Sequence, residues 1–152
     1  MNYKLIDFVN FSDEKGSLVA CEYQKNCPFD IKRIFYIFDV NPSAIRGRHA
    51  NRDSEFLFVA LNGSCKIKID NGKTQEIFTL NNPKQGLYVG KMLWKEMFDF
   101  SQGCVLLVMS NTSYNKGEYI HDYAMYSRAG GGGEIFPFCS LLSKKRLKSG
   151  IR

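Results

Sequence analysis

Short apolar-rich runs alternate with polar turn segments along most of the chain. Their lengths and their alternation of apolar and polar residues are typical of β-strands. Clusters such as "NPS", "NGS" and "NNPKQG" separate the runs, and their residues favour turns. Eight short strands at this spacing predict an all-β sandwich or barrel, because closure protects the sheet edges. The predicted strands cover residues 17–23, 31–40, 54–63, 65–70, 74–80, 86–90, 95–100 and 105–110.

Two local signals refine this pattern. Asp70, Asn71 and Gly72 lie between two of the predicted strands, and Asn and Gly tolerate the positive φ of a tight reversal. We therefore expect a β-hairpin at this point. Near the end of the strand series, "KGEYIHDYAMYSRA" at residues 116–129 is the one stretch with helical character. The sequence thus predicts a β-domain with a short C-terminal helix.

An uninterrupted glycine run, Gly130 to Gly133, predicts the end of the folded domain. Four consecutive glycines lose too much backbone entropy to hold regular structure cheaply. The expected organisation is one domain over residues 1–129, followed by a flexible glycine-rich linker and basic tail over 130–152. Residues 134–152 hold five basic residues and one acidic residue. We interpret this short run as a solvated end rather than a site for nucleic acid or an anionic membrane.

Composition favours a globular intracellular protein. The 152 residues are 44% hydrophobic, enough for one sizeable core. The five cysteines form no CxxC pair, so we expect reduced thiols in the cytoplasm. The N-terminal segment lacks the apolar block of a signal peptide, and no stretch has the length of a membrane span.

Two stretches resemble the paired motifs of the cupins, "RGRHANRDSEFLFVALNG" (46–63) and "GLYVGKMLWKEM" (86–97). Cupins are small β-barrels of the jelly-roll type, so the resemblance implies a cupin-type jelly-roll barrel or sandwich. In the first motif Asn51 stands where cupins often place a second histidine, two residues after His49. In the second motif Lys95 follows Trp94, at the usual position of another histidine.

These departures argue against a bound metal ion. A metal-binding cupin needs about three imidazoles and a carboxylate around one ion, whereas this chain has two histidines, His49 and His121. His121 lies outside both motifs, and Lys95 brings positive charge to the place where a cation would sit. We predict no metal and no other cofactor. Glu55, at the cupin glutamate position, is then interpreted as a structural group.

A narrower resemblance covers about residues 3 to 125. "KRIFYIFD", "LNGSCKI" and "GLYVGKMLWKEM" are similar to segments of the dTDP-4-keto-6-deoxyglucose 3,4-ketoisomerases, metal-independent dimeric cupins of bacterial deoxysugar synthesis. The resemblance implies an isomerase that moves a carbonyl from C4 to C3 of a dTDP-linked 4-keto-6-deoxyhexose. The product feeds synthesis of a 3-amino-3,6-dideoxyhexose for lipopolysaccharide or another surface glycan. The resemblance also implies a homodimer, with neither nucleic acid nor membrane as a partner.

The chemistry requires a group that accepts a proton from C3 and returns one to C4, with stabilisation of the intervening enediolate. Imidazole suits this task because its pKa lies near neutrality, and His49 is the predicted acid and base. Asn51 can hold a sugar oxygen but cannot titrate. Relay of the hydroxyl proton then falls to water or another group, and Tyr36 is the predicted candidate.

The resemblance also supplies a set of expected substrate-binding residues. Guanidinium groups suit the diphosphate because they offer paired donors at fixed geometry. Aromatic and acidic side chains are expected to contact the base or sugar. The predicted substrate-binding residues are Arg33, Arg46, Arg52, Tyr88, Trp94 and Glu96. The facing of Arg48 stays open, and strand alternation predicts that Lys95 points away from Glu96.

Three other functions remain open at this point. A catalytically impaired cupin that binds dTDP-sugar fits the loss of the second histidine. A 3,5-epimerase-like cupin also acts beside a ketone, although "KRIFYIFD" argues against it. A nucleic-acid role rests on the basic tail alone. The configuration of the product at C4 is also open, with Lys15 and Gly16 leaning towards the galacto form.

Overall fold

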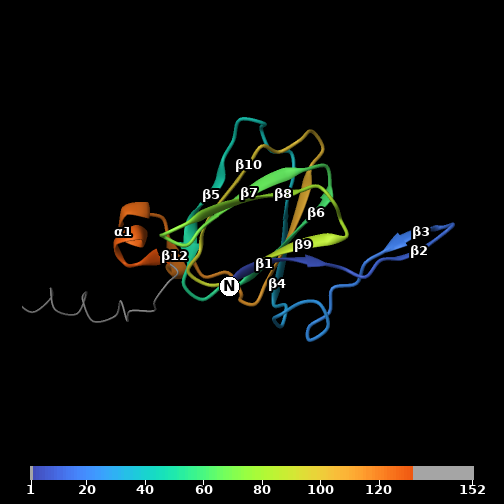
Figure 1. The fold of residues 1–152 in the computed structure, drawn as a ribbon, viewed down its shortest axis with the longest axis horizontal. Coiled ribbons are helices and arrows are strands. Elements are labelled where there is room, and N and C mark those ends of the chain that lie inside the picture. The colour runs from blue at the N-terminus through green and yellow to red at the C-terminus, as the bar shows by residue number, and fades with distance from the viewer. Residues whose placement is uncertain (1, 132–152) are drawn as a thin grey trace, which may run out of the picture.

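The computed structural model describes residues 2–131. Two five-stranded antiparallel sheets face each other (Figure 1), which confirms the predicted all-β, cupin-type jelly-roll architecture. Residues 132–152 of the predicted linker and tail lie outside the described residues. No described helix is both long and apolar enough to span a bilayer.

Each sheet combines strands that are distant in the sequence. In spatial order the first sheet consists of β1 (Tyr3–Asp7), β9 (Gln85–Val89), β6 (Phe56–Asn62), β11 (Val105–Ser110) and β4 (Arg33–Ile37). The second consists of β12 (Tyr119–Ile120), β5 (Arg46–Asn51), β10 (Trp94–Phe98), β7 (Cys65–Asp70) and β8 (Gln75–Leu80). A separate hairpin of β2 (Phe11–Asp13) and β3 (Gly16–Leu18) extends beyond the sheets, opposite the end that carries α1 (Tyr123–Arg128) (Figure 1).

The main core lies between the two sheets, and strand alternation decides which residues reach it. On β6, Phe56, Phe58 and Ala60 face this core, whereas Leu57 and Val59 face the opposite side of the first sheet. That outer side is covered by Phe8, which follows β1, and by Cys27 and Phe29 in the irregular segment between β3 and β4. A third, smaller cluster of Ala50, Trp94 and Tyr126 joins α1 to the outer face of the second sheet.

Seven of the eight predicted strands are confirmed with small shifts at their ends. The predicted strand at 17–23 is wrong beyond Leu18. The apolar residues that follow cover the outer side of the first sheet instead of extending a strand. Cys21, for example, packs against the cluster that contains Cys27 and Phe29. The hairpin is confirmed: Gly72 adopts φ +87°, and Asn71 N donates to Thr74 O over 3.2 Å.

The predicted helical stretch divides into three pieces. A 3-10 turn over Lys116–Glu118 and the short β12 precede α1. The helix begins after Asp122, whose side chain accepts from Met125 N at 3.1 Å and satisfies a free donor of the first turn. The polar strand β5 was not among the predicted strands, and it carries the histidine motif.

Candidate active site

Strand β5 turns the histidine motif towards the space between the sheets. Ala50 is fully buried against Trp94 and Tyr126 on the outer face, so its neighbours His49 and Asn51 point inward. Gly47 adopts φ +85°, and a Cβ at this position would lie 2.8 Å from Lys95 O. Glycine is therefore required where β5 meets the irregular register between Lys95 and Glu96.

Lys95 lies opposite His49 in the register of β10 and β5 and enters the interior with it. Its Nζ donates to Asn51 Oδ1 at 2.7 Å and lies 4.7 Å from the centre of the Phe56 ring. Asn51 Nδ2 donates in turn to Glu118 Oε1 at 3.1 Å. The asparagine amide thus links a buried ammonium group to a buried carboxylate.

The Glu118 carboxylate accepts most of the hydrogen bonds in this network. It accepts the backbone N–H groups of Asp53 and Ser54, each at 2.9 Å, and the Ser54 hydroxyl. Burial by itself raises the pKa of Glu118, but the hydrogen bonds from Ser54, Asp53 and Asn51 outweigh it and hold the pKa below the usual value. Glu118 is therefore ionised near neutral pH and balances the charge of Lys95.

The same surroundings make His49 a neutral imidazole. Its Nδ1 lies 3.0 Å from Gly47 O, and since a carbonyl oxygen only accepts, Nδ1 carries the proton and Nε2 is left as an acceptor. Burial lowers the pKa of His49 to about 4, and the positive charge of Lys95 contributes in the same direction. Burial also lowers the pKa of Lys95, to about 7. Near neutral pH Lys95 is therefore protonated in part of the molecules, and a neutral acceptor beside this buried cation suits proton abstraction that creates an anion.

Two aromatic rings, those of Tyr119 and His121, pack beside His49. The ring centroid of Tyr119 lies 4.8 Å from that of His49, and the centroid of His121 lies 5.6 Å away. Tyr119 and His121 stack on each other, with 13° between their ring planes. Tyr114 continues the row, 5.9 Å from Tyr119.

Arg33 completes the arrangement, which we call the His49 cluster and define as His49, Asn51, Lys95, Glu118, Arg33, Tyr119 and His121. The Arg33 guanidinium lies over the rings of Phe35 and Tyr114, at 5.2 and 5.7 Å. Its Nε and Nη2 are buried and have no hydrogen-bond partner. Buried donors without acceptors fit an anionic ligand, and a guanidinium suits a phosphate.

Three predicted site residues therefore belong to this cluster: His49 and Asn51 on β5, and Arg33, which the ring of Tyr114 connects to Tyr119. Trp94 and Glu96 lie on the other face of β10, where Trp94 Nε1 donates to Glu96 Oε1 at 3.2 Å. Glu96 also forms an ion pair with Lys68 at 2.9 Å. The structure thus separates Glu96 from Lys95, as alternation predicts, and it does not bring Trp94 or Glu96 to His49.

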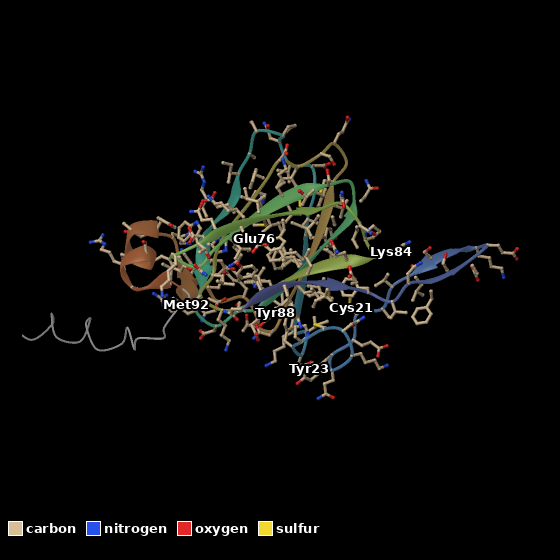
Figure 2. All side chains as sticks on the ribbon, in the orientation of Figure 1. Cys21, Tyr23, Glu76, Lys84, Tyr88 and Met92 are labelled. Atoms are coloured by element: carbon tan, nitrogen blue, oxygen red, sulfur yellow. The ribbon has the colours of Figure 1, made fainter. Side chains whose placement is uncertain are left out.

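Other predicted residues lie further away. Tyr88 lies on the outer side of the first sheet, on the same side as Cys21 and Tyr23 (Figure 2), and its hydroxyl donates to Glu55. Glu55 also accepts from Asn111 Nδ2 at 3.0 Å, in agreement with its interpretation as a structural group. Tyr36 is 63% exposed on the edge strand β4, with its ring against Phe38.

Two of the predicted arginines are exposed. Arg46 begins β5, and Arg52 follows that strand and donates from Nη1 to Gly117 O at 3.2 Å. The facing of Arg48, left open by the sequence, is towards solvent with φ +57°. Among residues 2–131, no three His, Cys, Asp or Glu side chains are arranged to hold a metal ion.

Sequence reasoning missed that Glu118, Tyr119 and His121 lie beside His49 and Asn51. They lie in the segment predicted as helical, and β12 is only two residues long. The useful signal is the pairing of β12 with β5, in which Tyr119 lies opposite Asn51 and Ile120 opposite Ala50. That pairing is visible in the tertiary structure and has no counterpart in the local sequence.

Comparisons with known proteins place this geometry in context. The family described as "FdtA: WxcM-like, C-terminal" matches residues 1–130. The chain is 44% identical over 128 residues to a TDP-4-oxo-6-deoxy-α-D-glucose-3,4-oxoisomerase of Aneurinibacillus thermoaerophilus, covering 84% of this chain and 92% of the relative.

Solved structures give the same result. WlaRA, a TDP-fucose-3,4-ketoisomerase from Campylobacter jejuni, is 49% identical with a TM-score of 0.83, covering 86% of this chain and 97% of that one. A second structure is the 3,4-ketoisomerase QdtA from Thermoanaerobacterium thermosaccharolyticum, a histidine-to-asparagine mutant solved with TDP-4-keto-6-deoxyglucose. It is 39% identical with a TM-score of 0.82, and the match covers 85% of this chain and 94% of that one. ChmJ, a 3'-monoepimerase from Streptomyces bikiniensis, shares the fold at 12% identity and a TM-score of 0.68. That match covers 78% of this chain and 68% of ChmJ.

Proposed function

The chain belongs to the FdtA family of WxcM-like C-terminal proteins, and from this premise we propose that it is a dTDP-4-keto-6-deoxy-D-glucose 3,4-ketoisomerase. Its high identity to a 3,4-oxoisomerase and to solved 3,4-ketoisomerases supports this activity. The observation that carries the proposal is the neutral His49 imidazole, with its Nε2 free, beside the buried cation of Lys95.

In this reaction His49 removes the proton from C3. The electron pair of the C3–H bond forms a C3–C4 double bond, and the carbonyl electrons move to O4 to give an enediolate. The positive charge of Lys95 favours that anion over the neutral ketone. A proton then passes from O3 to O4, the electrons of O3 form the new carbonyl, and His49 returns its proton to C4. The sugar keeps its atoms and its oxidation state overall.

Arg33 supplies the binding of the nucleotide. Its unsatisfied Nε and Nη2 offer two donors from one planar group, which suits an oxygen of the diphosphate. The rings of Phe35 and Tyr114 pack against the guanidinium and favour one orientation of it. QdtA, with TDP-4-keto-6-deoxyglucose bound in its mutant form, is a relative that holds such a ligand.

The impaired binding module predicted as the alternative is not better supported. Asn51 lies in a closed network with Lys95 and Glu118, so it orders the site even though it does not titrate. The deciding experiment incubates the protein with dTDP-4-keto-6-deoxyglucose and follows the 3-keto product by NMR. Product formation well above the rate without protein supports the isomerase. Tight binding without product supports the impaired cupin instead, and deuterium uptake at C5 supports the epimerase-like alternative.

Replacing Arg33 with alanine is expected to raise KM for the dTDP-sugar by about 10- to 100-fold, since a charge-assisted hydrogen bond contributes about 1.5–3 kcal/mol. The kcat should change much less, because the diphosphate is remote from the reacting carbons. Arg33→Lys should recover part of the loss. Arg128→Ala, which removes an exposed arginine on α1, is the matched control and should leave KM unchanged. Equal KM values for Arg33→Ala and the unmodified protein would contradict the assignment.

We also propose that the chain acts as a homodimer in the cytoplasm and supplies a surface-glycan sugar, with the galacto configuration at C4 of its product. Exposed apolar side chains support an interface: Phe11 and Leu18 on the hairpin of β2 and β3, and Ile34 on the edge strand β4, are each about 60% exposed. Sheet edges and apolar surfaces of this kind favour association. Sedimentation at micromolar concentration should give twice the mass of one chain, and a monomer would refute the dimer.

A further inference from the structure

The two histidines among residues 2–131 converge in the structure although they are far apart in the sequence. β12 pairs with β5 so that Tyr119 lies opposite Asn51 and Ile120 opposite Ala50. One step further in the same antiparallel register, His121 comes opposite His49, and their ring centroids are 5.6 Å apart. Residues that oppose each other in an antiparallel pair share one face. His121 therefore faces the same space as His49.

Asn51, by contrast, has no free access to this space. It is 1% exposed, its Oδ1 accepts from Lys95 and its Nδ2 donates to Glu118. An amide does not take up or release a proton near neutral pH. If the chain has the ketoisomerase activity proposed above, the transfer of a proton from O3 to O4 needs a group other than Asn51. Tyr36, the candidate from the sequence, lies exposed on β4 with its ring against Phe38.

We propose that His121 is the second proton carrier of this active site, and that it moves the hydroxyl proton of the sugar while His49 moves the carbon-bound one. This inference rests on the proposed function. The O3–H bond breaks as the His121 imidazole takes the proton, and an O4–H bond forms as the imidazole releases a proton. His121 ends as it began, and no oxidant, reductant or further reactant is consumed.

The surroundings of His121 fit this role. Tyr119 stacks on its ring at 5.8 Å and 13°, which fixes the ring plane beside His49. The residue is exposed, so a ligand can reach its ring, whereas Lys95 and Glu118 are buried. The separation of 5.6 Å between the rings allows both imidazoles to reach adjacent positions of one hexose.

The test separates the two proton transfers. The unmodified protein, His121→Asn and His121→Phe are each incubated with dTDP-4-keto-6-deoxyglucose in D₂O, and NMR follows both deuterium uptake at C3 of the substrate and formation of the 3-keto product. The phenylalanine variant keeps a ring against Tyr119 but carries no proton. We expect both variants to form product about 100-fold more slowly, while uptake at C3 falls less than about fivefold, because His49 still removes that proton.

A rise in the ratio of uptake to product in both variants supports the proposal, since a merely structural loss lowers the two rates together. Product formation by His121→Phe at the unmodified rate overturns it, because the ring would then act as a spacer. Equal losses of uptake and product in both variants also overturn it. Absence of both product and uptake with the unmodified protein refutes the isomerase function itself, and so differs from failure of the His121 proposal.

Discussion

Replacing His49 with alanine is expected to lower kcat for carbonyl migration by about 10³-fold or more, the upper part of the range for loss of a general acid and base. His49 carries the free Nε2 acceptor of the cluster, and its Nδ1 is held by Gly47 O. In the proposed reaction the same imidazole takes a proton from C3 and returns one to C4, so its loss should affect both halves of the reaction. The measurement is the rate of product formation by NMR at saturating substrate.

His49→Gln is the matched variant, since it keeps a polar side chain of similar length but cannot accept a proton near neutral pH. It should be as slow as His49→Ala, whereas both should bind dTDP with nearly unchanged affinity through Arg33. Circular dichroism establishes that both variants are folded. A kcat above about a tenth of the unmodified value in either variant is incompatible with His49 as the base.

The same assignment sets the pH dependence of the reaction. Burial, with the charge of Lys95, lowers the pKa of His49 to about 4. A base is active when unprotonated, so kcat/KM should stay level as the pH falls through 6.5 and should decline only towards pH 4. A decline centred near 6.5, the ordinary value for histidine, would indicate that the base lies in a solvated place. The declining limb of kcat/KM reports the free enzyme, so low substrate concentrations are used.

Replacing Glu118 with alanine is expected to give the largest loss of stability, about 3–5 kcal/mol in the free energy of unfolding. The variant loses the acceptor for the backbone N–H groups of Asp53 and Ser54 and for Asn51 Nδ2. It also leaves the buried ammonium of Lys95 without its counter-charge. Unsatisfied buried donors and an unpaired buried charge are each costly. Urea unfolding measures the change, together with a Tm lowered by roughly 10 °C.

Glu118→Gln keeps one acceptor and removes the charge, so its loss should be smaller, about 1–3 kcal/mol. It also provides a measurable variant if the alanine protein does not fold. Glu14→Ala, in the exposed turn between β2 and β3, is the control and should change the free energy of unfolding by less than about 0.5 kcal/mol. A loss in Glu118→Gln no larger than in Glu14→Ala would show that the network does not stabilise the fold.

The alternation of apolar and polar residues predicted the strands that have one apolar face. It failed to predict β5, whose residues do not alternate in this way. β6 and β7 were predicted almost to the residue because their apolar positions fill the core. β5 was missed because its inner face carries His49 and Asn51, and because Gly47 and Arg48 adopt positive φ. The residues that β5 contributes to the His49 cluster also remove its alternating pattern.

The sequence by itself determined the all-β class and the family through residues 3–125, and it predicted His49 as the central group, because these follow from local pattern and motif. Only the tertiary structure decided which partners surround His49. Strand alternation shows that Lys95 and Glu96 face opposite sides, but not which side is the interior. Pairing between strands distant along the chain decides that Lys95 faces the interior. It also sets the network from Lys95 through Asn51 to Glu118 and the distance between His121 and His49. A local sequence pattern does not encode such pairing, since the partner strand β12 is too short to have a period of its own.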